Sequence, residues 1–155
     1  MYSYATMGTP VRDAAGRIRN AVLLLHGTGG RGANFLRPEL MRGDSVAFPP
    51  GGCAYTHVHQ GPGIRCMIEG GIRIDTRGRS TSYGPGGAWY ETGPDPVFAQ
   101  AAADKPSRFI RVMILPRALI GKSSIQYVKA EDKDKPKTQS YKVYADAPIE
   151  FEGKS

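Results

Sequence analysis

The chain has 155 residues, which is enough for one domain with a sizeable core, and 40% of them are hydrophobic. Its 20 glycines and 12 prolines favour many short strands over long helices. The net charge of +7 does not indicate nucleic-acid binding, because the basic residues are spread along the chain and no nucleic-acid motif is present.

The N-terminal stretch "MYSYATMGTP" lacks the apolar core and basic flank of a secretory signal. No apolar run approaches the roughly 20 residues that a membrane span needs. We therefore expect a cytoplasmic protein without a membrane partner, in which Cys53 and Cys66 are reduced.

Residues 1–40 differ from the rest of the chain, and we predict that they form a strand-rich arm. The run "NAVLLLHGTGGRG" at 20–32 contains a G-x-G-x-x-G pattern, but the following segment is too short for the helix of a dinucleotide-binding unit. Residues 4–36 resemble the opening strands of α/β-hydrolases of the homoserine acetyltransferase group. The chain has neither a G-x-S-x-G elbow nor a histidine beyond His59, so we interpret this arm as structural.

Residues 41–128 read as short β segments separated by glycine- and proline-rich turns, which predicts an all-β sandwich or barrel. Residues 129–155 begin with the mixed-charge stretch "KAEDKDKPK", which predicts a solvated C-terminal tail. We expect this tail to contain at most an edge strand.

The segment from 47 to 116 resembles the cupin family, whose RmlC-like fold is a double-stranded β-helix, or jelly-roll barrel. Gly51 is followed after five residues by His57 and His59, as in the first cupin motif. The second motif is matched by Gly78, Pro85 and Gly87. The glutamate of the first motif falls at Gly63 and the histidine of the second at Tyr90, so two of the four usual metal ligands are missing.

Within the cupins, "HVHQGPG" and the "STSYGP…YETG" stretch are similar to small bacterial acetylacetone dioxygenases. Those enzymes also lack the motif glutamate, and they hold Fe(II) with three histidines. The resemblance implies that their third histidine falls near Val97, where it is not kept, and that their additional glutamate falls on Glu91.

Strand alternation predicts which side chains face the barrel interior. If His57 and His59 face inward, so does Tyr55. Across the next turn, Gly63, Arg65 and Met67 then share the inward face, while Ile64, Cys66 and Ile68 face outward. An inward Arg65 needs an anionic partner, either Glu91 or a substrate. A register slip of one residue would instead place Arg65 in solvent.

Two histidines spaced one residue apart on a strand are suited to holding a transition metal. We predict a divalent Fe, Mn, Ni or Zn ion on His57, His59 and Glu91, with Arg65 and Glu91 acting in catalysis. Tyr55, Met67 and Tyr90 are predicted to line the pocket. Tyr90 and Gln60 are alternative third ligands, and His26 is another if the arm enters the barrel mouth.

These features indicate a metal-dependent, dioxygenase-like or Lewis-acid cupin that acts on a small oxygenated or anionic molecule. The alternatives are a non-catalytic cupin that binds or senses a small molecule, and a barrel that serves only oligomerisation. Because the apolar "AVLLL" of the arm needs cover, we also expect a homodimer.

Overall fold

The computed structural model describes residues 11–12, 18–20 and 39–149. The chain forms two units, Met1–Arg37 and Pro38–Ser155. In the first unit, β1 (Val11–Arg12) pairs antiparallel with β2 (Ile18–Asn20). Most of the hydrolase-like run, including His26, lies outside the described residues, so the role of the arm stays a prediction.

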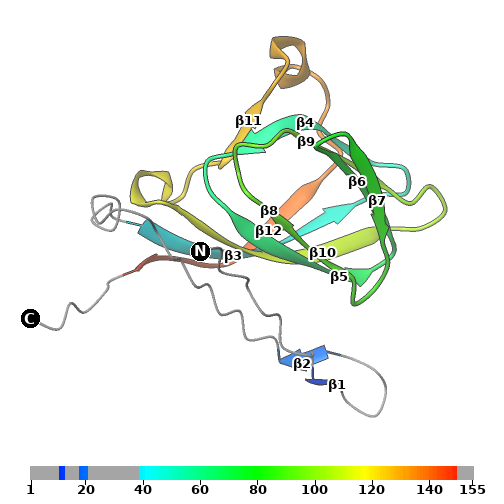
Figure 1. The fold of residues 1–155 in the computed structure, drawn as a ribbon, viewed down its shortest axis with the longest axis horizontal. Helices are drawn as coiled ribbons and strands as arrows, with labels where there is room; N and C mark the ends of the chain where they lie inside the picture. Colours follow the sequence, from blue (N-terminus) through cyan, green and yellow to red (C-terminus); the bar gives the residue numbers. More distant parts are fainter. Residues whose placement is uncertain (1–10, 13–17, 21–38, 150–155) are drawn as a thin grey trace, which may run out of the picture. The chain divides into compact units, whose positions relative to one another are not determined.

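Within the described residues, the second unit contains two five-stranded antiparallel sheets (Figure 1). Their strand orders are β12-β3-β10-β5-β8 and β11-β4-β9-β6-β7. The strands are β3 (Glu39–Phe48), β4 (Cys53–His59), β5 (Gly63–Glu69), β6 (Ile72–Thr76), β7 (Arg79–Tyr83), β8 (Ala88–Glu91), β9 (Val97–Ala101), β10 (Ser107–Pro116), β11 (Ile125–Tyr127) and β12 (Ser140–Ile149).

The pairing of these strands is nested around the turn between β6 and β7. Strand β6 pairs with β7, β5 with β8, β4 with β9 and β3 with β10. The chain from β3 to β10 is therefore one long antiparallel ribbon, folded at Arg77 and Gly78, whose successive strand pairs lie alternately in the two sheets. This arrangement is a jelly roll, and it confirms the all-β jelly-roll barrel predicted from the sequence.

The interior of the barrel is layered, with polar side chains between two apolar clusters. The larger cluster includes Phe48, Met67, Trp89 and Phe109, and the smaller one consists of Leu40, Met113 and Leu115. Between them lie six buried polar or charged residues: Asp44, His57, His59, Arg65, Glu91 and Arg111. A barrel of this size is normally filled by apolar side chains, so the polar layer marks the place where function is to be sought.

The C-terminal part extends the first sheet. Short 3-10 helices, η1 (Arg117–Leu119) and η2 (Ala130–Lys133), flank β11, and β12 pairs with β3 at the sheet edge. Strand β12 lies in the charged segment 129–155, for which an edge strand was considered possible, and 150–155 lie outside the described residues. In the described part of the chain, no helix is long and apolar enough to span a membrane.

Candidate functional site

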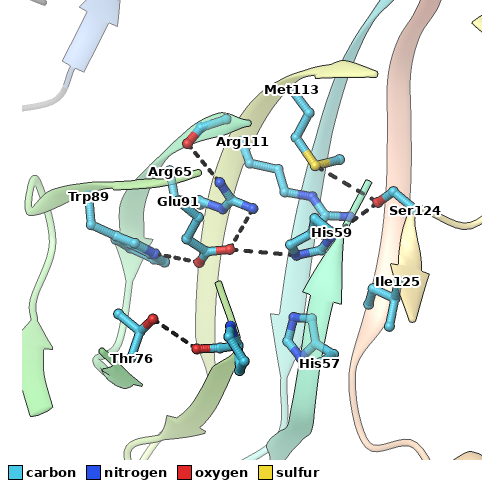
Figure 2. A network of polar contacts seen from close by, with 12 residues as sticks. His57, His59, Arg65, Thr76, Trp89, Glu91, Arg111, Met113, Ser124 and Ile125 are labelled. Carbon is cyan, nitrogen blue, oxygen red and sulfur yellow. Dashed lines mark hydrogen bonds and ion pairs between the residues drawn. The ribbon is translucent and has the colours of Figure 1, made fainter. Parts of the chain in front are cut away.

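The two histidines project from β4 into the polar layer, and both are buried (Figure 2). The Nδ1–H group of His57 donates to the carbonyl oxygen of Tyr55 at 2.7 Å, which leaves the lone pair on Nε2. The Nδ1 atom of His59 lies 3.2 Å from Oγ of Ser124. Because the Ser124 hydroxyl is placed to donate to Sδ of Met113 at 3.9 Å, we assign the His59 proton to Nδ1 as well.

The electrostatic setting keeps both imidazoles neutral. Burial is the main cause that lowers the pKa of each ring, and the nearby guanidinium groups of Arg65 and Arg111 lower it further. A neutral imidazole with a hydrogen-bonded Nδ1–H group and a free Nε2 is the form that binds a metal.

Arg65 lies on β5 with only 1% of its surface exposed. Its Nη1 donates to the carbonyl oxygen of Gly63 at 2.7 Å, and its Nη2 lies 2.7 Å from Oε2 of Glu91. Burial lowers the pKa of Arg65 to about 10, opposed by the charge of Glu91, so the guanidinium stays charged at neutral pH. Arg65 is therefore a buried cation whose main counter-charge is one carboxylate.

Gly63 leaves room for this guanidinium. A Cβ atom at Gly63 would lie 3.1 Å from Nη1 of Arg65, 2.6 Å from the Val112 carbonyl oxygen and 2.7 Å from Cγ of Met113. A glutamate at this motif position would have to displace backbone as well as Arg65. Glycine at the position of the motif's glutamate thus leaves space for the guanidinium group of Arg65, two residues later.

Glu91 is the centre of the network in Figure 2. Its Oε1 accepts a hydrogen bond from Nε1 of Trp89 at 2.8 Å, and its Oε2 lies 3.6 Å from Nε2 of His59. Although Oε2 is close to Arg65, the contact is not aligned as a hydrogen bond, and both Oε2 and Nη2 of Arg65 are buried without a hydrogen-bond partner among the described residues. These two atoms are poorly satisfied for their depth.

The polar layer surrounds an interior cavity of about 20 Å³. Its wall includes His57, His59, Arg65, Glu91 and Arg111. A volume of this size holds about one water molecule or one ion. A larger hollow of about 480 Å³ at the β6–β7 turn lies on the open surface and includes neither histidine, so we place the candidate site in the interior.

Solved structures of other proteins are similar to this chain. They include an RmlC-like cupin from Shewanella frigidimarina (16% identity, TM-score 0.43, covering 50% of this chain and 68% of that one) and a cupin 2 conserved barrel domain protein from Salinispora arenicola (16%, 0.42, 47% and 61%). A third is the polyketide cyclase RemF from Streptomyces resistomycificus (19%, 0.48, 64% and 67%). The chain spans less than two thirds of the Salinispora protein.

The chain is thus similar to solved cupins, and its jelly-roll topology is shown by its own strand pairing. No protein-family model and no curated protein matches the sequence. The identities are low, so the likeness concerns the fold and leaves the chemistry to be argued from the site.

The position of Tyr55 differs from its prediction. The register between β4 and β9 shifts between Ala54 and His57, so Ala54, rather than Tyr55, shares the inward face with the histidines. Tyr55 is only half-buried, and the ammonium groups of Lys135 and Lys137 lie over its ring at 5.1 and 5.4 Å. A bulge of this kind re-aims a side chain without changing the rest of the strand.

Tyr90 also differs from its predicted position. It is 56% exposed on the outer face of β8, while its neighbours Trp89 and Glu91 are buried. The pairing of β8 with β5 is regular, so plain alternation turns Tyr90 outward and Glu91 inward. Met67 faces inward as predicted, but it belongs to the apolar cluster and is absent from the cavity wall described above.

Sequence reasoning missed the pair of Arg111 and Asp44. Nε and Nη2 of Arg111 donate to the two carboxylate oxygens of Asp44 at 2.6 and 2.9 Å, and both side chains are buried. In the sheet register, Asp44 lies opposite Arg111, and Arg111 opposite Arg65. Alternation along "SRFIRVMILP", with Phe109 and Met113 inward, would have indicated that Arg111 faces the interior.

The donors of this site fit a divalent metal ion in type and protonation state. Two neutral imidazoles present Nε2, and an orphaned carboxylate oxygen lies 3.6 Å from one of them. They are not yet gathered into one cluster, because the described residues contain no group of three or more His, Cys, Asp or Glu side chains placed to hold a metal. The third donor, Glu91, is engaged by Arg65.

Proposed function

We propose that the interior of this cupin barrel binds a divalent transition metal, Fe, Mn, Ni or Zn, and that the protein acts on a small oxygenated or anionic molecule. His57 and His59 would hold the ion through Nε2, and Glu91 would be the third protein donor. When bound, the ion would supply a Lewis acid or redox centre for oxygen atoms of the substrate.

The observation that carries this proposal is the approach of two acceptors. Nε2 of His59 and Oε2 of Glu91 lie 3.6 Å apart, which is too far for a good hydrogen bond. At this distance in a dry interior, their two lone pairs repel each other. A proton between them is disfavoured, because burial and two guanidinium groups lower the pKa of His59. A metal ion in the adjoining cavity would relieve the repulsion, because it can bind both atoms directly, whereas Arg65 contacts only Oε2.

The protein groups have distinct roles in this proposal. Trp89 fixes Oε1 of Glu91, so that Oε2 is the oxygen left to bind or to move a proton. Arg65 offers positive charge to an anionic substrate. Arg111 and Asp44 neutralise each other and keep the polar layer rigid, while the apolar clusters on both sides exclude water.

A non-catalytic binding or sensing cupin is the second candidate, and the Arg65–Glu91 pair favours it. With the histidines neutral, the charges of Arg65 and Arg111 are balanced by those of Glu91 and Asp44, so the interior is neutral without a metal. In this case the barrel would hold a small molecule without turnover.

Metal content separates the two candidates. The full chain is purified without chelator after growth with added iron, manganese, nickel and zinc, and its metals are measured by elemental analysis. The proposal predicts close to one metal ion per chain. A chain that contains no stoichiometric metal, and takes up none on reconstitution, favours the binding module.

A further inference from the structure

Oε2 of Glu91 lies near two groups that compete for it. It lies 2.7 Å from Nη2 of Arg65 on one side and 3.6 Å from Nε2 of His59 on the other. In the described structure it pairs with Arg65, and the described residues contain no gathered group of three metal donors. A metal ion can use this oxygen only if Glu91 gives up part of its contact with Arg65.

We propose that Glu91 exchanges between Arg65 and the metal, and that a small carboxylate ligand takes its place on Arg65. This inference rests on the proposed function, and it names the ligand class: a small carboxylic acid, bound as its anion. Metal and carboxylate then bind cooperatively. The carboxylate pairs with Arg65 and so frees Glu91 for the metal, while the metal binds Glu91 and so frees Arg65 for the carboxylate.

Arg65 cannot simply turn to solvent when Glu91 leaves. It is 1% exposed, and its Nη1 is tied to the carbonyl oxygen of Gly63 at 2.7 Å. Leaving a buried charge without its partner is strongly unfavourable. A replacement anion on Nη2, which already lacks an aligned hydrogen bond, removes that penalty.

The charge balance of the polar layer also favours a bound anion. The two arginines and two carboxylates cancel, so a divalent ion alone would leave a net charge of about +2 in a low-dielectric interior. One carboxylate ligand halves this excess. Anion binding therefore strengthens metal binding, and linkage requires the reverse effect to be equal.

The geometry allows a short movement. The hydrogen bond from Nε1 of Trp89 to Oε1 at 2.8 Å holds one oxygen of Glu91 while Oε2 turns towards His59 (Figure 2). The cavity of about 20 Å³ holds about one ion, so a carboxylate must take the space beside Arg65 that Glu91 leaves, and formate, the smallest carboxylate, is the appropriate probe.

The experiment is a calorimetric titration of Co²⁺ into the full-length protein, with and without formate. Sodium methanesulfonate, a larger anion, keeps the ionic strength constant. The coupling predicts that formate lowers the Kd for Co²⁺ at least tenfold. Reciprocally, Co²⁺ or Zn²⁺ should lower the Kd for ¹³C-formate by the same factor. NMR of the unmodified protein measures this Kd.

Three variants locate the effect. Arg65→Met should bind Co²⁺ with an affinity independent of formate, whereas Arg65→Lys, which keeps the charge, should retain part of the dependence. Arg73→Gln is the matched control, because Arg73 forms an exposed pair with Asp75 and should behave as the parent.

The outcomes distinguish this inference from the proposed function. If the parent binds Co²⁺ with the same Kd with and without formate, the exchange is wrong and the metal site stands. If formate dependence persists in Arg65→Met, the anion binds elsewhere and the exchange is wrong as well. If Co²⁺ binds under neither condition, the proposed function itself fails.

Discussion

Oε2 of Glu91 and Nε2 of His59 face each other at 3.6 Å inside the barrel, with no proton favoured between them. Glu91 stands on β8 and His59 on β4, in different sheets, so the jelly roll brings together two residues that are 32 positions apart. This relationship carries the proposed metal site.

The first prediction concerns the histidines. His57→Ala and His59→Ala should each weaken metal binding by about 100-fold or more, because each removes one of the imidazole donors. Elemental analysis of the purified variants and calorimetric Kd values measure the effect. His26→Ala is the control with the same chemical change, and it should retain the metal. Equal loss in the His26 variant would instead bring the N-terminal arm into the site.

The second prediction separates the two roles of Glu91. Glu91→Gln should weaken metal binding by about 10–100-fold if Oε2 reaches the ion. It should also lower the free energy of unfolding by about 3–5 kcal/mol, because Arg65 loses its counter-charge. In the double variant with Arg65→Ala, part of that stability should return, which urea denaturation would show. Unchanged metal affinity in Glu91→Gln would reduce Glu91 to the partner of Arg65.

The third prediction is a gain of metal affinity. Val97 is buried and lies opposite His57 in the β4–β9 register, so the two side chains point into the same space. Val97→His should add a third imidazole and lower the Kd for Zn²⁺ by tenfold or more. Phe98→His, one residue away on the other face of β9, is the control and should leave the Kd unchanged. Similar Kd values in both variants would contradict the assigned position of the metal.

The fourth prediction concerns pH. The folded state lowers the pKa of both His57 and His59 below the ordinary value of 6.5, mainly through burial. The unfolded chain therefore binds more protons below pH 6.5, and the stability present above that pH is lost as the pH falls. Each histidine should contribute a slope of up to about 1.4 kcal/mol per pH unit. Urea titrations of the metal-free protein at pH 7.5, 6 and 5 test this, and His57→Gln should reduce the slope.

The fifth prediction tests the packing at Gly63. A Cβ atom there would lie 2.6 Å from the backbone oxygen of Val112, which cannot move without disturbing β10. Gly63→Ala should therefore lower the free energy of unfolding by about 1–3 kcal/mol, the range of overpacked core positions. Gly84→Ala is the control, because a Cβ atom at Gly84 meets no atom of the described residues within 4 Å. Equal stability of both variants would show that the sheet adjusts freely.

Regular alternation made the larger part of this site predictable. His57, His59 and Arg65 face inward because β4 after its bulge and β5 alternate without interruption. The glycine- and proline-rich turns predicted an all-β sandwich or barrel, and the resemblance to the cupin motifs implied the jelly roll. At Tyr90 and Glu91 the sequence did not determine which side chain faces inward, because Tyr90 falls on the motif's ligand position. The regular pairing of β8 with β5 turns Glu91 inward and Tyr90 outward.

Other features depend on contacts that a single sequence does not contain. The bulge after Ala54 turns Tyr55 away from the interior, and only the register with β9 reveals it. The pairing of Asp44 with Arg111 joins residues 67 positions apart through the β3–β10 ladder. For Arg65, alternation left two possible partners, Glu91 and a substrate, and the contact with Glu91 is seen only in the folded chain.

The most direct test of the metal site uses the fact that the chain has three histidines, His26, His57 and His59. Long-range ¹H–¹⁵N NMR of protein labelled with ¹⁵N-histidine reports the state of each ring nitrogen during titration with Zn²⁺. The account predicts that the Nε2 signals of His57 and His59 shift at one equivalent, while their Nδ1 atoms stay protonated and His26 is unchanged. Nε2 signals of His57 and His59 that remain in place at saturating Zn²⁺ would contradict it.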